Sequence, residues 1–335
     1  MWMPRDIRTS VANKRWIGFI SITIIVILMI PFLGNIFLTH GMMLAFLYAF
    51  MALAWNLLCG YCGYFSLGHQ AFFGVGAYVT MILMLSLDLT PWVGMIVSGI
   101  AGAALAFAAG FPLFRTKSHW FTLATLAFGE LIKLIFINWD LVGAANGLEM
   151  PIKEESLYWL SYARPFVYYY VILGFLAVEF IILRLIIKSK IGYCLRAIRE
   201  SETTAMSVGI NPYKYKIIAM TISGFFFGIA GGFYTVKYKF IDPFSTMDWI
   251  LPTEIALCAI VGGLYWFIGP ILGAIIVTPT SYYVRAFFSA RFGGRFFALH
   301  RLIYGLILLI VILKLPDGLL GWIERKGIIK KLEGK

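Results

Sequence analysis

The sequence predicts an all-α integral membrane protein of about ten transmembrane or re-entrant helices, each needing about 20 apolar residues to cross a bilayer. Of the 335 residues, 61% are hydrophobic and only 13% are charged, whereas soluble domains have about 45–50% apolar and about 25% charged residues. This composition excludes an ordinary soluble protein. It also excludes a disordered chain, because so hydrophobic a sequence would not stay solvated.

The first predicted span is the apolar run over residues 16–38. Basic residues precede it, at Arg5, Arg8, Lys14 and Arg15. The run is longer than the core of about 7–15 residues in a secretory signal, and it lacks a cleavage site of small residues. We therefore expect an uncleaved span that follows a cytoplasmic N-terminus over residues 1–16.

Further apolar runs follow along the chain. They cover residues 41–59, 64–87, 93–112, 120–137, 166–187, 217–236, 250–264, 271–288 and 300–315. A polar interval over 188–216 separates a first transmembrane group of about six helices (17–187) from a second of about four (217–315), at about 20 residues per span. The runs at 64–87 and 250–288 contain glycine or proline, so one or more of their helices are candidates for re-entrant segments.

Basic residues predict the orientation of the chain in the membrane. Ten spans would place four segments on one side of the membrane: both termini, the loop at 113–119 and the interval at 188–216. That side carries 18 of the 28 Lys and Arg residues, and the other side carries 8. Cytoplasmic loops are enriched in Lys and Arg. We therefore attribute the net charge of +12 to orientation and not to nucleic-acid binding, and we expect a cytoplasmic basic tail over 316–335. The basic cluster from Arg285 to Arg301 would lie on the outer side, which makes it an exception to this enrichment of basic residues in cytoplasmic loops.

No motif for catalysis, nucleotide binding or metal binding is present. HExxH, GxSxG and GxxxxGK[ST] are all absent, so the chain lacks the usual phosphate cradle for ATP. Cys59 and Cys62 have CxxC spacing but no second pair of ligands, and we expect them to be buried side chains. The sequence therefore predicts no enzyme, no metal and no cofactor. A chain of this kind is a channel, an ion-coupled carrier or a permease that another subunit drives.

The polar interval 188–216 predicts a short cytoplasmic helix. Residues 192–208 alternate apolar and polar positions as a helix does, and Gly209 followed by Pro212 is typical of a helix end. Six basic and two acidic residues give the interval a charge of +4. Either the interval only anchors the orientation, or its helix docks onto a partner protein.

The same interval resembles the coupling loop of ABC-transporter permeases, and more narrowly that of the permeases for branched-chain amino acids. The general permease signature has Glu-Ala-Ala before the glycine. This chain has Glu202-Thr-Thr-Ala205 before Gly209, so only the glutamate, one alanine and the glycine match. The resemblance implies that the residues coupling the chain to ATPase subunits are Arg196, Arg199, Glu200, Glu202, Ala205 and Gly209.

Other segments resemble the same family, in the same order along the chain. They are the glycine-rich run Asn56–Tyr78, Thr122–Glu130, Ala145–Leu148, Val261–Gly273 and Leu315–Gly321. The likeness is to the LivM-type subunit, one of two non-identical permeases in such transporters. It implies a subunit of an importer that moves Leu, Ile and Val across a prokaryotic plasma (inner) membrane. The implied partners are a second permease, two ATPase subunits that bind the ATP, a periplasmic or surface substrate-binding protein, and membrane lipid.

Several residues at membrane depth are candidates for the substrate pathway. They are Asn56, Ser66, Gly68, His69, Gln70, Phe72 and Glu130. Glycines among them permit a broken helix whose free amides face a substrate, although glycines also serve tight helix packing alone. A charge at membrane depth costs about 2.5–3.5 kcal/mol on insertion scales. Glu130 therefore has either a role in the pathway or a structural ion pair with Lys133, one turn away.

Alternatives from other functional classes remain open. Relatives with similar motifs carry urea, short amides or nucleosides. A stand-alone ion-coupled carrier would need an intramembrane acid, for which Glu130 is the candidate, and an intramembrane enzyme would need a nucleophile and base, which are absent. One further pattern is internal, because Phe72–Thr80 resembles Phe226–Thr235, about 155 residues later, as in the internal repeats of transporters.

Overall fold

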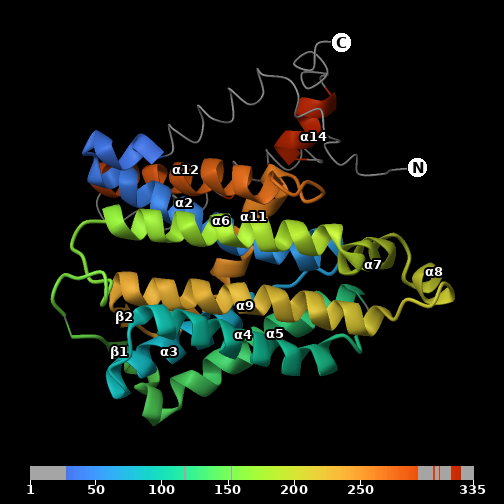
Figure 1. Ribbon diagram of the computed structural model, residues 1–335, viewed down its shortest axis with the longest axis horizontal. Helices are drawn as coiled ribbons and strands as arrows, with labels where there is room; N and C mark the ends of the chain where they lie inside the picture. Colours follow the sequence, from blue (N-terminus) through green and yellow to red (C-terminus); the bar gives the residue numbers. More distant parts are fainter. Residues whose placement is uncertain are drawn as a thin grey trace.

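Long helices make up nearly all of the computed structural model, which describes residues 28–116, 118–151, 153–292, 305, 309 and 318–325 (Figure 1). The helices are η1 (Ile30–Leu33), α2 (Ile36–Asn56) with a π-helical extension η2 (Leu57–Tyr61), α3 (His69–Ser86), α4 (Pro91–Leu113), α5 (Ser118–Ile137), η3 (Asp140–Val142), η4 (Ala144–Asn146), α6 (Phe166–Lys188), α7 (Lys190–Glu200), α8 (Glu202–Ser207), α9 (Pro212–Tyr238), α10 (Pro243–Thr246), α11 (Ile250–Gly262), α12 (Gly269–Phe292) and α14 (Gly318–Arg325). Two short strands, β1 (Leu148–Glu149) and β2 (Phe240–Ile241), pair antiparallel.

Seven of the described helical segments are long and apolar enough to cross a membrane. They are Ile36–Tyr61, His69–Ser86, Pro91–Leu113, Trp120–Ile137, Phe166–Lys188, Pro212–Tyr238 and Pro243–Gly262. The prediction of an all-α integral membrane protein is therefore confirmed. The predicted span at 300–315, most of the span at 16–38 and both termini lie outside the described residues. The described end of the 16–38 run is not continuous helix, because η1 ends at Gly34, which has a φ of +70°.

The helix α9 forms the centre of one half of the bundle, where it packs along α3 and α4. A Cβ atom at Gly231 would overlap the backbone oxygen of Phe73, so only glycine lets α9 approach α3 this closely. The hydroxyl of Thr235 donates a hydrogen bond to the Ala77 oxygen across the same contact (2.9 Å). The two similar segments, Phe72–Thr80 and Phe226–Thr235, thus lie on helices that pack directly against each other.

The predicted apolar run at 64–87 is not one helix. Its first part belongs to an irregular segment, residues 62–68, and α3 begins only at His69. The His69 ring reaches Ser223, which lies eleven residues after the start of α9, or about 16 Å along its axis. The irregular segment is therefore inside the membrane. The glycines of this run predict such a break, whereas hydropathy alone does not, because the irregular residues are themselves largely apolar.

The region from 243 to 292 forms a broken span and a hairpin. Asp242 caps α10, residues 247–249 are not helical, and α11 then runs for only 13 residues, about 20 Å. Since the hydrocarbon core is about 30 Å thick, α11 does not span the membrane alone. It packs closely against α12, where a Cβ at Gly262 would overlap the Gly269 oxygen.

The two ends of the bundle differ in character (Figure 1). The helices α7 and α8 project from one end, while β1 and β2 lie at the opposite end. The sequence predicts a single helix over 192–208, but the structure has two. Ser201 is extended between them, and its hydroxyl accepts a hydrogen bond from the Thr204 amide at the start of α8.

Candidate functional site

We call α7 and α8 together the inner segment, after the side of the membrane on which the sequence predicts them. It contacts the irregular segment inside the membrane. Arg199, at the end of α7, donates a hydrogen bond to the Gly60 oxygen at the end of η2 (2.9 Å). Its side chain lies against Gly63, and its guanidinium stacks over the ring of Tyr265, 4.1 Å from the centroid. One arginine therefore joins α7 to the end of η2, to the irregular segment and to the turn between α11 and α12.

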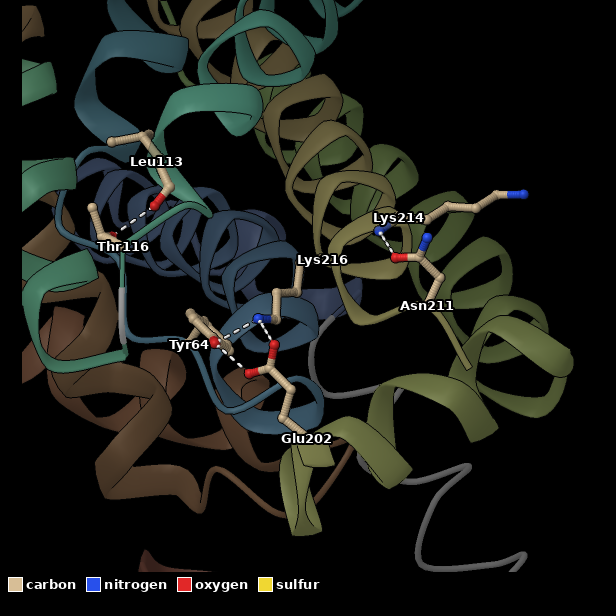
Figure 2. Close-up of polar contacts among 7 residues, drawn as sticks. All are labelled: Tyr64, Leu113, Thr116, Glu202, Asn211, Lys214 and Lys216. Carbon is tan, nitrogen blue, oxygen red and sulfur yellow. Dashed lines mark hydrogen bonds and ion pairs between the residues drawn. The ribbon is translucent and has the colours of Figure 1, made fainter. Parts of the chain in front are cut away.

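A second connection is a triangle of polar groups formed by Tyr64, Glu202 and Lys216, whose side chains point toward one another (Figure 2). The Tyr64 hydroxyl donates to Glu202 Oε2 (2.8 Å), and Lys216 Nζ donates to Glu202 Oε1 (2.5 Å) and to the Tyr64 oxygen (2.6 Å). Lys216 and Tyr64 are buried, whereas the Glu202 side chain is 39% exposed. The ammonium of a buried lysine thus depends on a carboxylate from the inner segment.

Local structure places each member of the triangle. Glu202 occupies the first position of α8, directly after the capping Ser201, where a negative charge is favourable. Lys216 lies in the second turn of α9, whose first turn is capped by Asn211 accepting a hydrogen bond from the Lys214 amide (Figure 2). Burial would raise the pKa of Glu202, but the hydrogen bonds from Lys216 and Tyr64 and the Lys216 charge outweigh it and lower the pKa below its ordinary 4.5.

The other predicted coupling residues divide into buried and exposed positions. Arg196 donates to the oxygens of Gly192 and Ile187, both at 3.3 Å, and so holds the junction of α6 and α7. Ala205 is buried. Glu200 is exposed, and Gly209 ends α8 with a φ of +82° in open space.

Two of the predicted pathway residues, Ser66 and His69, form a connected polar core in the membrane with Trp55 and Ser223. The backbone oxygen of Ser66 accepts a hydrogen bond from Trp55 Nε1 (2.8 Å). The two ring nitrogens of His69 each share a hydrogen bond of 2.9 Å with a serine hydroxyl, Nδ1 with Ser66 and Nε2 with Ser223. All of these side chains are buried. The core joins α2, the irregular segment, α3 and α9. Ser223 lies 154 residues after His69 in the sequence, so a local motif could not identify it as a partner of His69.

The irregular segment also receives hydrogen bonds from α5. Thr122 donates to the Phe65 oxygen (2.8 Å), and Thr125 accepts from the Leu67 amide (3.1 Å). Gly68 packs so closely on the Thr125 backbone that a Cβ would overlap it. Non-helical backbone at membrane depth is tolerated only where it is buried in protein or lines a water-filled cavity, and here two threonines help to satisfy it.

Two other pathway candidates are buried without a hydrogen-bond partner. The side-chain amides of Asn56 and Gln70 make no hydrogen bond within the described residues, although each is at most 1% exposed. Gln70 lies against Gly129 of α5, and Phe72 packs on the His69 ring, with 5.3 Å between centroids. These predicted pathway residues are thus buried among packed helices, and the glycines Gly68 and Gly129 bring α5 into contact with them.

The structure places Glu130 in the ion pair that the sequence predicts as one of its roles. Its Oε2 lies 3.7 Å from Lys133 Nζ, and the Glu130 side chain is 39% exposed. Sequence reasoning missed two further intramembrane acids. Glu179, on α6, is fully buried with both oxygens unpartnered within the described residues, and Glu254, on α11, accepts a hydrogen bond from the Tyr48 hydroxyl (2.6 Å). Each interrupts an apolar run, the same signal that singled out Glu130.

Glu179 lies at the depth of Asn56. The helices α2 and α6 run in the same direction and pack together, with the rings of Phe46 and Tyr169 5.2 Å apart. Asn56 and Glu179 each come ten residues later, about 15 Å further along their helices. Asn56 and Glu179 therefore form a layer of two buried polar groups, unpartnered within the described residues, at the level where α2 gives way to η2.

The polar core and the unpartnered amides predict different effects of substitution. Ser66→Ala removes a partner of His69, and we expect lower thermal stability, by about 0.6 kcal/mol and at most about 1.7 kcal/mol, as for interhelical hydrogen bonds in membranes. Gln70→Ala breaks no hydrogen bond within the described residues, and we expect several-fold lower uptake for the same amount of assembled complex. Thermal stability and uptake measured on the same membranes separate the two effects. Normal uptake per complex for Gln70→Ala would remove Gln70 from the pathway.

Comparison with known proteins places this architecture in a family. A family model described as branched-chain amino acid transport system / permease component matches residues 37–312. The chain is 26% identical to the high-affinity branched-chain amino acid transport system permease protein LivM of Escherichia coli (strain K12), over 73% of this chain and 63% of that protein. The chain thus spans less than two thirds of that relative's length.

Two other relatives broaden the comparison. The probable branched-chain amino acid transport permease protein LivH of Methanocaldococcus jannaschii is 26% identical, over 76% of this chain and 83% of that protein. The guanosine ABC transporter permease protein NupQ of Bacillus subtilis (strain 168) is 28% identical, over 64% of this chain and 70% of that protein. The resemblance to LivM-type permeases that the sequence motifs predict is confirmed. Since the family model covers most of its length, the chain belongs to the family of permease components of branched-chain amino acid transport systems.

Proposed function

We propose that this chain is a permease subunit of an ABC importer that carries Leu, Ile and Val inward across the plasma membrane of a prokaryote. It acts with a second, non-identical permease, two ATPase subunits and a periplasmic or surface substrate-binding protein. The chain itself is not an enzyme and holds no cofactor, because the partner subunits bind the ATP. Both termini are cytoplasmic in this proposal.

The observation that carries the proposal is the double connection between the inner segment and the membrane interior. Arg199 and Glu202 both sit on the inner segment, and both hydrogen-bond to groups at or next to the irregular segment, at Gly60 and Tyr64. A stand-alone carrier has no need for such a linkage. A permease driven from inside needs one, because the movement of the ATPase subunits must reach the substrate pathway.

The inner segment also offers a surface for the ATPase subunits. The helices α7 and α8 project away from the bundle (Figure 1). Three apolar side chains on them or directly after α8 are exposed, namely Tyr193 (62%), Met206 (51%) and Val208 (71%). Beside them Glu200 is exposed as well. Exposed apolar side chains with charged neighbours are typical of a protein interface. In this proposal the exposed residues contact the ATPase, while Arg199, Glu202 and Arg196 transmit its movement.

The predicted pathway residues keep their proposed role. Ser66 and Gly68 belong to the irregular segment, where a broken helix can open, and His69, Gln70, Phe72 and Asn56 lie on the helices that adjoin it. Glu130 keeps its proposed role on α5, next to the Gly129 that packs on Gln70. An apolar amino acid needs apolar walls and only transient polar contacts, since strong binding would slow release. Glu179 joins this set as a residue of the same layer.

The second candidate substrate is a nucleoside, which the similarity to the guanosine permease favours. Cells without their own leucine uptake can be supplied with this chain and its partner subunits. We expect uptake of labelled leucine, competed by isoleucine and valine but not by guanosine. Guanosine uptake, or competition by guanosine alone, would replace the amino-acid proposal with the nucleoside one.

A further inference from the structure

One face of the bundle exposes large apolar side chains on two neighbouring elements, α5 and α10, which pack together. We call it the α5–α10 face. Its residues, between 52% and 58% exposed, are Leu123, Leu131, Leu134, Phe244 and Trp249 at the start of α11. An apolar surface alone would suit lipid equally well. Two features of this face do not suit lipid.

The first feature is the ion pair of Glu130 and Lys133 at the border of the face. Glu130 is partly exposed, and Lys133 Nζ lies 5.8 Å from the centroid of the exposed Phe244 ring. Gly129 packs on Gln70, which lies 16 residues before the end of α3, or about 24 Å along its axis. The charges are therefore deep in the membrane, where ionisable residues almost always face protein or a water-filled cavity.

The second feature is the break between α10 and α11. Residues 247–249 are not helical, and Trp249 is half exposed. Met247 packs on Gly74, twelve residues and about 18 Å before the outer end of α3. Lipid-exposed irregular backbone does not occur within the hydrocarbon region. Met247 itself is buried, whereas Asp248 is partly exposed and Trp249 half exposed, so protein or a water-filled space is needed to cover this side of the break.

The helix α6 provides the comparison within the same molecule. Its exposed side chains include Val178, Ile181 and Leu185, at 56%, 59% and 65% exposure, on an uninterrupted helix. The two exposed cations on this helix are Lys188 at its inner end and Arg184 one turn before it, where both side chains can reach the membrane surface. This face has the composition that lipid requires.

We infer that the α5–α10 face is the surface on which the second, non-identical permease subunit packs. The inference rests on the proposed function, which supplies that partner. The partner contributes an apolar helix against Leu131 and its neighbours and a polar group near Glu130 and Lys133. It also covers the break at residues 247–249, and the α6 face is left to lipid.

Photo-crosslinking in the assembled transporter tests the inference. The crosslinking residue p-benzoylphenylalanine replaces Leu131 or Trp249 on the α5–α10 face, and Val178 or Ile181 on α6 as matched controls. The complex is isolated through a tag on an ATPase subunit. We expect adducts with the second permease from Leu131 and Trp249, and none from Val178 and Ile181. Adducts with the second permease only from the α6 positions, adducts between two copies of this chain, or lipid adducts alone from the α5–α10 face would each overturn the inference.

A wedge variant gives an independent readout. Ala127 lies on the exposed stripe of α5 between Leu123 and Leu131. We expect Ala127→Trp to lower the yield of co-purified second permease several-fold and Ile181→Trp to leave it unchanged; equal yields from both would contradict the inference. If no second permease co-purifies with the unmodified chain, the proposed function itself fails. This outcome differs from a failure of the interface inference alone, in which the second permease co-purifies equally with both variants.

Discussion

Glu202→Gln is expected to lower ATP-driven uptake at least about tenfold, the change that about 1.4 kcal/mol of lost coupling produces, while the assembled complex continues to hydrolyse ATP. The substitution removes the carboxylate that holds the buried Lys216 ammonium and accepts from Tyr64. Breaking a buried ion pair by removing one partner costs about 3–5 kcal/mol, and the partial exposure of Glu202 reduces this cost. The spans themselves should remain folded, because Arg199 still holds α7 against Gly60.

The control is Glu154→Gln, which neutralises an exposed acid in the loop between β1 and α6, away from the inner segment, and should leave uptake unchanged. A double variant, Glu202→Gln with Lys216→Gln, removes both charges and should recover part of the stability lost by the single change. Unchanged uptake by Glu202→Gln in fully assembled complexes would show that the triangle does not transmit coupling.

The triangle should also be visible in the pH dependence of stability. The folded-state pKa of Glu202 is lowered from 4.5, so its stabilising contribution is present above pH 4.5 and is lost as the pH falls through the lowered value. The stability difference between the unmodified chain and Glu202→Gln should therefore be constant at neutral pH and shrink at acidic pH. A difference that grows on acidification would contradict the assignment.

Gly231→Ala is expected to cause a large loss of stability. Its Cβ would overlap the Phe73 backbone oxygen and crowd the Ala77 amide nitrogen, and backbone atoms cannot move aside as a flexible side chain can. Overpacking typically costs about 1–3 kcal/mol and occasionally more, and we expect the upper end here. The result should be a lower melting temperature and less assembled complex.

Gly174→Ala is the matched control for this prediction. Gly174 is also inside a long helix, but nothing lies within 4 Å of the position a Cβ would take. Alanine favours a helix by about 1 kcal/mol over glycine, so stability should stay equal or rise. Equal losses from both variants would mean that helix propensity, and not the contact of α3 with α9, explains the effect.

Apolar runs located the continuous helices well and the interrupted ones poorly. The runs at 120–137 and 166–187 correspond closely to α5 and α6, because each is an unbroken stretch between polar loops. The irregular segment at 62–68 overlaps the predicted run at 64–87, because it contains apolar residues such as Phe65. Hydropathy scores such residues alike whether the backbone is helical or not.

The site shows the same division between local and distant information. Glu202 and Arg199 were predicted from a motif within one loop. Tyr64 lies 138 residues from Glu202, and only folding brings them together. Lys216 was assigned to a cytoplasmic loop, because a lysine near a span end normally faces water, yet the Glu202 carboxylate lets it be buried. Glu179 interrupts an apolar run as Glu130 does, so the same pattern predicts it as an intramembrane acid.

Uptake of labelled leucine by proteoliposomes that contain this chain and the second permease, with and without the two ATPase subunits, tests the central claim most directly. The claim is that movement enters from ATPase subunits through the inner segment and reaches the irregular segment. It predicts uptake only when the ATPases, ATP on their side of the membrane and the substrate-binding protein on the other side are all present. Uptake that an ion gradient sustains in vesicles without the ATPases would contradict it.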